Sequence, residues 1–283
     1  MNILLTIQQN MKRLSPSAQK LAKYVLENPS EVTQLNTQEL AETVGVSPAT
    51  VVRFSKSMGL AGFTELKLKL AAVSGEDDQA LIEEVTADET VKSIKQKLAL
   101  RLNHMIEQTN QQLDDVAVER TVDLFDEHPV IYVYGIGASA LVAQDIMQKF
   151  TRIGRYVFYT QDEHLLLSSM AVQAEKSLLI VISNSGETAE VIHLAQAAQE
   201  LDITVVALTG NDDSTLAKLA NQVMTTISDE QVPLRVAATI SLMAQLYTVD
   251  ILFYNYVSRY FYESRVKVKQ SRQLVARLKR DFK

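Results

Sequence analysis

Two short segments contain the residue types and the spacing that an anion site needs. Residues 135–139 read GIGAS and residues 183–188 read SNSGET, and each follows a short apolar run. Glycines let the backbone approach a ligand closely, and the free N–H groups at a helix start favour negative charge. The serine and threonine hydroxyls of both segments add neutral donors. Together they predict a pocket for the phosphate of a small polar molecule.

Both segments have other interpretations. Residues 135–140 also satisfy the G-x-G-x-x-A pattern of dinucleotide-binding turns. That signal is weak, because residues 159–161 (Tyr-Thr-Gln) stand where an acidic residue would hold the ribose, and Asp162 lies beyond them. The SNSGET segment alone is also compatible with an ordinary serine-rich helix cap.

A second kind of chemistry is indicated by residues 37–60, TQELAETVGVSPATVVRFSKSMGL. The pattern predicts two helices joined by a tight turn, with Thr37 as the first N-cap and Gly45 in the left-handed turn. Ser47 caps the second helix and Pro48 takes its first position. This is the pattern of a helix-turn-helix, whose second helix enters the DNA major groove. A plain helical hairpin is the alternative.

The face of the second helix favours the helix-turn-helix over the plain hairpin. Val51, Phe54 and Met58 are expected to face inward, and Thr50, Arg53, Lys56 and Ser57 outward. Small residues at the helix start, together with Arg53, favour contact with bases and phosphates. The candidate DNA-contacting residues are Thr37, Ser47, Pro48, Ala49, Thr50, Arg53, Lys56 and Lys67.

The elements that position the anion segments follow from hydrophobic patterning. Five β-branched runs alternate with helical segments and predict strands buried on both faces of a parallel sheet. They are residues 130–135, 156–160, 177–183, 203–209 and 222–227. A long helix from Pro233 to about Tyr262 is expected to close the layer. Both anion segments then lie at carboxyl ends of strands, where ligands bind in open α/β sheets.

The 283 residues are enough for two domains, and 47% are hydrophobic. We expect an all-α helix-turn-helix domain over residues 1–77, a linker with a connecting helix over 78–110, and an α/β doubly wound domain over 111–283. The longest apolar stretch, 236–257, is interrupted by Gln245 and Asp250, which indicates a buried helix and not a membrane span.

Charge and cysteine content narrow the class of protein. The chain has no cysteine, which excludes disulfides and thiolate metal sites and fits a reducing cytosol. The net charge of −6 argues weakly against nucleic acid, but residues 1–75 hold eight Lys/Arg against five Glu. The four histidines do not pair at ligand spacing, so we expect no metal site, and no catalytic pair or cofactor is evident.

With these motifs in view, nearly the whole chain resembles the RpiR-type (MurR/RpiR) family of transcriptional regulators. The resemblance is carried by LSPSAQKLAKYVLENP (14–29), LNTQELAETVGVSPATVVRFSKSMGL (35–60), AGFTELKLKL (61–70), GIGAS, SNSGET and LRVAATISLMAQLYTVDIL (234–252). The second domain is similar to the sugar isomerase (SIS) domain, which phosphosugar isomerases share.

The resemblance implies a cytoplasmic regulator, not an enzyme, with operator DNA and a phosphorylated sugar as partners and a homodimer or tetramer as the assembly. It places the sugar phosphate on Ser183, Ser185 and Thr188, with Ser139 from the first segment. The full set of expected effector-binding residues is Gly137, Ser139, His164, Ser183, Asn184, Ser185, Gly186, Glu187, Thr188 and Arg235.

Two other functions are compatible with the sequence. A sugar-phosphate isomerase would need a general base and an acid around the sugar, for which Glu187 and Glu230 are conceivable. Glu187 could equally be a first-turn acid favoured by the helix dipole. A dinucleotide-binding redox sensor is the third possibility. A dedicated helix-turn-helix favours the regulator over the isomerase.

Overall fold

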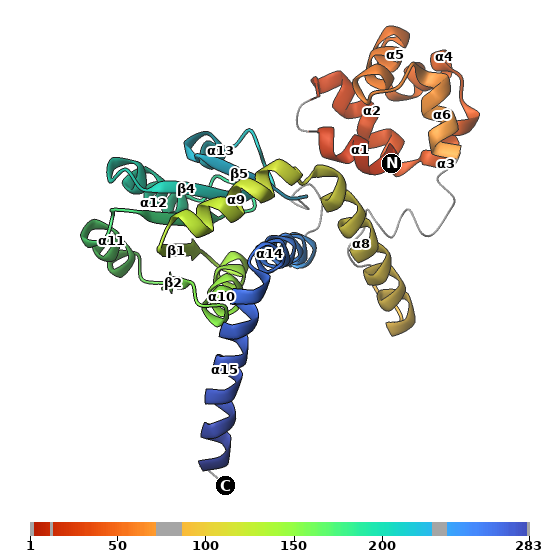
Figure 1. Cartoon of the computed structure of the whole chain (residues 1–283). Helices are drawn as coiled ribbons and strands as arrows, with labels where there is room; N and C mark the ends of the chain where they lie inside the picture. Colours follow the sequence, from red (N-terminus) through yellow and green to blue (C-terminus); the bar gives the residue numbers. More distant parts are fainter. Residues whose placement is uncertain (1–2, 12–13, 72–86, 228–236, 282–283) are drawn as a thin grey trace. The chain divides into compact units, whose positions relative to one another are not determined.

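The structure, a computed structural model, describes residues 3–11, 14–71, 87–227 and 237–281 (Figure 1). It divides into two units between Arg101 and Leu102, inside one helix, α8 (Val91–Gln112). That boundary falls within residues 78–110, the segment expected to connect the two domains.

Every regular element described before α8 is a helix. These are α1 (Ile3–Asn10), α2 (Pro16–Glu27), α3 (Pro29–Gln34), α4 (Thr37–Val44), α5 (Pro48–Ser57) and α6 (Phe63–Ala71). Prolines at the first position begin α2, α3 and α5, because proline has no N–H to lose there. The helices bury one apolar stripe each around Leu21, Leu40 and Phe54, which form one core.

A five-stranded parallel sheet forms the centre of the second unit. The strands are β1 (Val130–Gly135), β2 (Tyr156–Tyr159), β3 (Ser177–Ile182), β4 (Thr204–Thr209) and β5 (Gln222–Thr225), in the order β2-β1-β3-β4-β5. All four pairings are parallel. The predicted doubly wound α/β fold is therefore confirmed.

Helices cover both faces of this sheet. They are α9 (Asp115–Glu127), α10 (Ala138–Arg152), α11 (Glu163–Val172), α12 (Ala189–Glu200), α13 (Thr215–Leu219) and α14 (Thr239–Arg259). Alternate residues of β1 serve the two faces: Ile131 and Val133 pack with α9, α10 and α14, whereas Tyr132 and Tyr134 pack with α11 and α12. The strands read as continuous apolar runs because both faces are buried.

Two predicted helices differ in extent from those observed. The closing helix predicted from Pro233 begins at Thr239, and residues 233–236 lie outside the described residues. Helix α14 ends at Arg259, and after Tyr260 a further helix follows, α15 (Phe261–Asp281). The sequence pattern does not separate these two helices. The connecting helix expected within residues 78–110 corresponds to α8, which begins at Val91, where the Thr90 hydroxyl accepts the N–H of Ser93 and caps the helix. Residues 78–86 lie outside the described residues.

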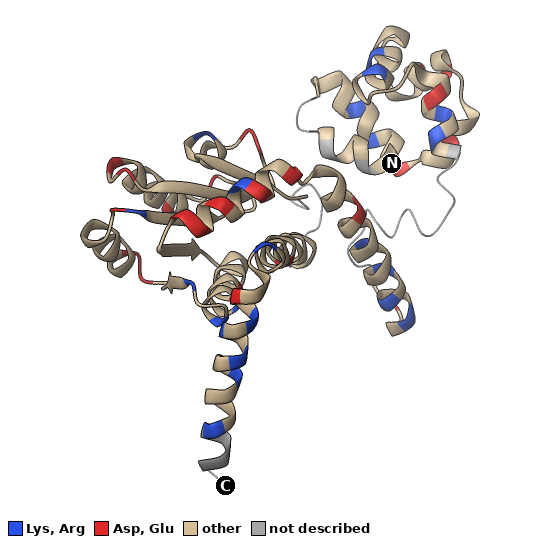
Figure 2. Ribbon diagram, in the orientation of Figure 1, with Lys and Arg blue, Asp and Glu red and all other residues tan. Residues whose placement is uncertain are grey.

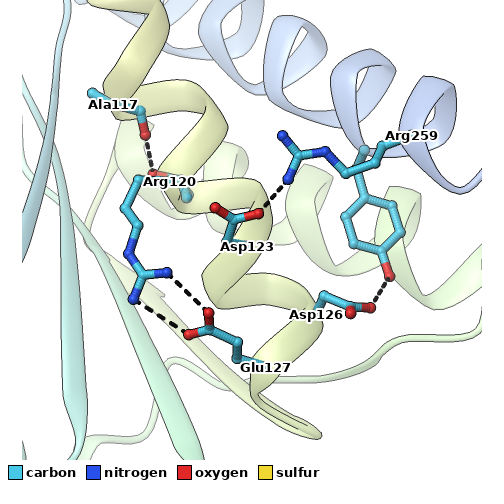
Figure 3. Close-up of polar contacts among 8 residues, drawn as sticks. Ala117, Arg120, Asp123, Asp126, Glu127 and Arg259 are labelled. Atoms are coloured by element: carbon cyan, nitrogen blue, oxygen red, sulfur yellow. Dashed lines mark hydrogen bonds and ion pairs between the residues drawn. The ribbon is translucent and has the colours of Figure 1, made fainter.

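Polar contacts hold α14 against α9 at the rim of the core (Figure 3). Arg259 pairs with Asp123, and the Tyr256 hydroxyl lies 3.5 Å from Asp126 Oδ1. Beneath them Tyr256 packs edge-on to Phe150, with ring centroids 5.6 Å apart. Across the residues that the structure describes, no helix has the length and apolar character to cross a membrane.

Candidate functional site

Topology brings the two anion segments together. β1 and β3 are neighbours, and Gly135 and Ile182, the last residues of each, are register partners. The chain leaves β1 through α10 toward β2 and leaves β3 through α12 toward β4, in opposite directions along the sheet. A crevice at such a switch point is where ligands bind in doubly wound sheets.

The two helices at this point begin without a side-chain cap in the described part of the chain. Gly137, the residue before α10, has no side chain to offer, and its φ of 61° and ψ of −123° suit glycine. Thr188, the residue before α12, makes no capping hydrogen bond. By contrast, α9, α11 and α13 are capped by Asp114, Asp162 and Ser214. No side chain therefore caps the start of α10 or of α12, which leaves room for an anion there, although the N–H groups of Ser139 and Ala140 donate to the Ile136 and Gly137 carbonyls at 3.2 Å.

Hydroxyl groups line the turn after β3. Ser183 is buried, and its Oγ accepts the Gly186 N–H at 3.1 Å and lies 2.8 Å from Thr188 Oγ1. Half-buried Ser185 accepts the Glu187 N–H at 3.2 Å. A hydroxyl that accepts a backbone N–H still has its own proton to donate. The turn thus presents donors to a phosphate while its backbone is already fixed.

Neighbouring loops hold this turn in place. The Asn184 carbonyl accepts the Gly210 N–H at 2.9 Å, and the Gly186 carbonyl accepts the Leu216 N–H at 3.1 Å. Gly186 has a φ of 68°, and a Cβ there would lie 2.1 Å from the Oγ of Ser214. Only glycine lets the turn approach α13 this closely.

The carboxylate of Glu187 is hydrogen-bonded within the protein. Its Oε1 accepts the Thr215 N–H at 2.8 Å, across to the first turn of α13. This hydrogen bond lowers the pKa of the exposed Glu187 carboxyl below its ordinary value. The carboxylate therefore serves the helix start of α13, which leaves no strongly basic carboxylate at this position for proton transfer.

The structure adds a residue that sequence reasoning missed. Gln245 of α14 is 1% exposed, and its Oε1 lies 3.5 Å from the Ser139 Oγ. Its Nε2 has no hydrogen-bond partner among the described residues. The signal was present as a polar residue that interrupts the apolar stretch 236–257. In the sequence alone, Gln245 indicates a buried helix and does not point to this site.

The remaining expected effector residues, His164 and Arg235, do not belong to the two turns that follow β1 and β3. His164 is exposed in the first turn of α11, at the carboxyl end of β2. Tyr134, also missed from the sequence, donates its hydroxyl to Glu163 at 2.9 Å and so fixes that turn. Burial raises the pKa of Tyr134, so the hydroxyl keeps its proton. Arg235, like Glu230, lies outside the described residues.

The candidate DNA-reading helix is α5. The Ser47 hydroxyl accepts the Thr50 N–H at 3.2 Å and caps the helix, Pro48 is its first residue, and Gly45 has a φ of 72° in the turn before it. Ala49 and Arg53 are exposed, together with Ser47, Pro48 and Lys56. The inward set Val51, Phe54 and Met58 is buried, as predicted.

Two expectations for this unit need correction, and a third residue, Lys67, has a contact within the unit. Thr50 does not face outward: it is 9% exposed and its hydroxyl lies 2.9 Å from Ser47 Oγ, because the cap draws it inward. The N-cap of α4 is Asn36 and not Thr37, since Asn36 and Glu39 form a reciprocal capping box. Half-buried Lys67 donates to the Leu35 carbonyl at 2.9 Å, which caps the end of α3.

Comparison with known proteins assigns the family. A model of the rpiR-family helix-turn-helix domain matches residues 1–75, and a model of the SIS domain matches residues 123–254. An uncharacterized HTH-type transcriptional regulator of Thermotoga maritima is 34% identical over 89% of this chain and 91% of that protein. The chain belongs to the RpiR-type family of transcriptional regulators. YbbH of Bacillus subtilis, of the same designation, is 34% identical over 88% of each chain. The expectation of a regulator is confirmed at the level of the family.

Solved structures agree with this assignment. The NanR protein of Vibrio vulnificus, complexed with ManNAc-6P, is 28% identical and superposes with a TM-score of 0.62 over 98% of this chain and 99% of that one. The sugar isomerase domain of an RpiR transcription factor from Sphaerobacter thermophilus has a TM-score of 0.55 at 19% identity, over 62% of this chain and 99% of that one. The second likeness shows the fold of the second unit.

Proposed function

We propose that this regulator binds operator DNA of sugar-metabolism genes through α5, and that a phosphorylated sugar in the crevice between β1 and β3 changes that binding. The observation that carries the sugar-phosphate half is the pair of uncapped helix starts that follow register partners Gly135 and Ile182. Two convergent helix dipoles and a set of hydroxyls favour a dianion over a neutral sugar.

The residues proposed for the phosphate are Ser139, Ser183, Ser185 and Thr188, with N–H groups of α10 and α12. The ligand of NanR, ManNAc-6P, supports a sugar phosphate as the class of effector. His164 is proposed to contact the sugar portion, because it lies in the first turn of a helix at the carboxyl edge of the same sheet. The absence of a charged lysine or arginine from the two turns 136–139 and 183–188 leaves dipoles and hydroxyls to bind the anion.

The DNA-binding half rests on the exposed start of α5. Ser47, Pro48, Ala49 and Arg53 form a small-residue surface with one long cation, which suits close approach to base edges and phosphates. Lys56 is exposed on the same helix and is proposed to contact a phosphate. A two-fold operator requires at least a homodimer. A protein that acts on bacterial-type operators works in the cytoplasm.

The test measures effector binding and DNA binding on the same protein. Isothermal titration with N-acetylmannosamine 6-phosphate and a panel of other sugar phosphates, each paired with its unphosphorylated sugar, identifies the effector. We expect only phosphorylated sugars to bind. Ser183→Ala with Ser185→Ala should weaken binding more than a hundredfold, since each donor lost to a charged group costs about 1.5–3 kcal/mol.

The matched control is Ser258→Ala, an exposed serine in the last turn of α14, which should bind the effector normally. Gel shifts with the DNA upstream of the gene complete the test. The double variant should bind that DNA as the wild type does but lose the response to the sugar phosphate. Failure of every sugar phosphate to bind, or an unchanged response in the double variant, refutes the proposal.

A further inference from the structure

A buried glutamine lies beside the turn that follows β1. Gln245 of α14 is 1% exposed, and its Oε1 accepts the Ser139 hydroxyl at 3.5 Å, at the start of α10. Its Nε2 has no hydrogen-bond partner among the described residues. A buried amide donor without a partner destabilises the protein, because burial removes the water that would otherwise accept from it. This donor therefore points to a second state of the site, in which it is used.

The backbones on both sides of this contact are fixed. A Cβ on Gly135 would lie 2.7 Å from the Ser139 carbonyl oxygen, so only glycine at the end of β1 lets the start of α10 approach this closely. Further along the two helices, Lys149 of α10 pairs with Asp250 of α14 at 2.7 Å. A change between Ser139 and Gln245 is therefore expected to come from rotation of the hydroxyl and of the side-chain amide.

The contact between Ser139 and Gln245 joins neutral groups in an uncharged surrounding on both helices. Residues 135–144 and 239–249 contain no Asp, Glu, Lys or Arg, and Figure 2 draws both stretches in tan. A hydrogen bond between neutral groups is weaker than one to a charged acceptor. A phosphate dianion that reaches Ser139 should therefore take the hydroxyl proton away from the Gln245 oxygen.

The hydrogen-bonding capacity of the two side chains makes such an exchange possible. A serine hydroxyl has one proton to donate and lone pairs that accept, and a glutamine amide has an acceptor and a donor on the same group. In the free protein the Ser139 proton goes to Gln245 Oε1. Once a phosphate takes that proton, rotation of the amide brings Nε2 to the Ser139 oxygen, and the unpartnered donor gains an acceptor.

We propose that Gln245 is a positioning residue of the effector site, whose amide changes from acceptor to donor toward Ser139 when the phosphate binds. The amide then holds the Ser139 hydroxyl in the rotamer that donates to the phosphate. This role rests on the proposed function, because it requires that Ser139 binds the effector phosphate. It applies to any phosphorylated effector, because the sugar portion takes no part in the exchange.

Titration calorimetry on four proteins measures the role of Gln245: the wild type, Gln245→Met, Ser139→Ala and the double variant. Methionine is flexible and fills the space of glutamine without a strong donor or acceptor. The probes are inorganic phosphate and N-acetylmannosamine 6-phosphate, with the other sugar phosphates that bind the wild type. Gln245→Met should weaken binding roughly tenfold when Ser139 is present. In the Ser139→Ala background it should weaken binding less than about twofold.

Thr248→Val is the matched control on the same helix. Thr248 lies in the next turn of α14, is fully buried, and its hydroxyl has no hydrogen-bond partner among the described residues. The substitution removes a buried polar group from α14 without removing a contact to Ser139. All probes should bind this variant as they bind the wild type, and thermal unfolding checks that each variant is folded.

The side-chain amide of Gln245 reports the exchange directly in spectra of ¹⁵N-labelled protein. Its Nε2 protons should move downfield when a probe binds the wild type, because they gain an acceptor, and should stay in place in Ser139→Ala. This measurement needs no substitution at position 245, so it decides even if Gln245→Met does not fold.

The outcomes separate this role from the proposed function. If the wild type binds a probe but the Gln245 amide does not move, or if Gln245→Met weakens binding equally with Ser139 and with alanine at position 139, the role of Gln245 is overturned and the effector site stands. If the wild type binds neither phosphate nor any sugar phosphate, both are overturned.

Discussion

Replacement of Gly186 by alanine tests how the effector turn is positioned. The added Cβ would lie 2.1 Å from Ser214 Oγ and 2.4 Å from Ser214 Cβ, and the residue keeps a φ of 68°. Two penalties therefore add. The left-handed conformation costs an L-residue about 1–2 kcal/mol, and overpacking against α13 costs about 1–3 kcal/mol. Gly186→Ala should lower the free energy of unfolding of the second unit by about 2–5 kcal/mol.

A second substitution separates the two penalties. Ser214→Gly removes the two atoms closest to the new methyl group and leaves Thr209 Oγ1 at 3.0 Å. An N-cap serine replaced by glycine costs only a few tenths of a kcal/mol. In that background Gly186→Ala should keep the backbone penalty and lose most of the overpacking penalty. The double-mutant cycle should therefore show a coupling free energy of about 1–3 kcal/mol.

Tyrosine fluorescence during urea unfolding is the assay, because the chain has no tryptophan and nine of its ten tyrosines follow residue 101. It therefore reports the second unit. Gly45→Ala is the control for the backbone penalty, since it has a φ of 72° with nothing within 4 Å of the new Cβ. Because Gly45 lies in the first unit, unfolding of this variant is followed by circular dichroism. If Gly186→Ala is equally destabilising in both backgrounds, the close approach to Ser214 does not exist and the turn is positioned otherwise.

The remaining predictions concern other contacts. Asn36→Ala should destabilise the N-terminal unit by about 0.5–2 kcal/mol in thermal unfolding, because it removes a capping box; an unchanged melting temperature would speak against that cap. Arg53→Ala should weaken operator binding in gel shifts and leave effector affinity unchanged, and equal DNA affinity would mean that α5 is not the reading helix. Phe150→Ala should cost about 3–5 kcal/mol, because its ring lies 4.3 Å from that of Phe125, and Phe150→Leu should cost clearly less. The pKa of Glu187 is lowered in the fold, so its contribution to stability is present above the unfolded pKa near 4.5 and is lost as the pH falls through the folded value. Glu187→Gln should therefore differ from wild type in stability at pH 7, and the difference should shrink as the pH falls below 4.5.

The sequence predicted the sheet well because its strands are buried on both faces. Continuous apolar runs such as 177–183 leave little freedom in assigning strands, and the glycine that ends β1 marks the turn to α10. Because both segments directly follow such strands, parallel pairing predicts that GIGAS and SNSGET lie at the same, carboxyl edge of the sheet. Periodicity did not reveal that α14 stops at Arg259, because helical spacing continues through Tyr260 into α15.

Side-chain positions were predicted less well where two polar groups compete for one hydrogen bond. Asn36 and Thr37 are both good N-caps, and Glu39 decides for Asn36 because it reaches back to the Asn36 N–H at 2.7 Å. Thr50 was placed outward by helical spacing, but its bond to Ser47 turns it inward. Glu187 and Gln245 depend on contacts to residues 28 and 106 positions away, which no local pattern contains.

Amide spectra of protein labelled with ¹⁵N only at glycine test the central claim most directly, because the whole chain has nine glycines. Addition of the sugar phosphate that binds in the titration should shift the amide resonances of Gly137 and Gly186, which lie at the two turns proposed to bind the phosphate. Gly154 precedes β2, at the opposite edge of the sheet, and should stay in place. A bound sugar phosphate that leaves Gly137 and Gly186 unmoved while it shifts Gly154 would contradict the account.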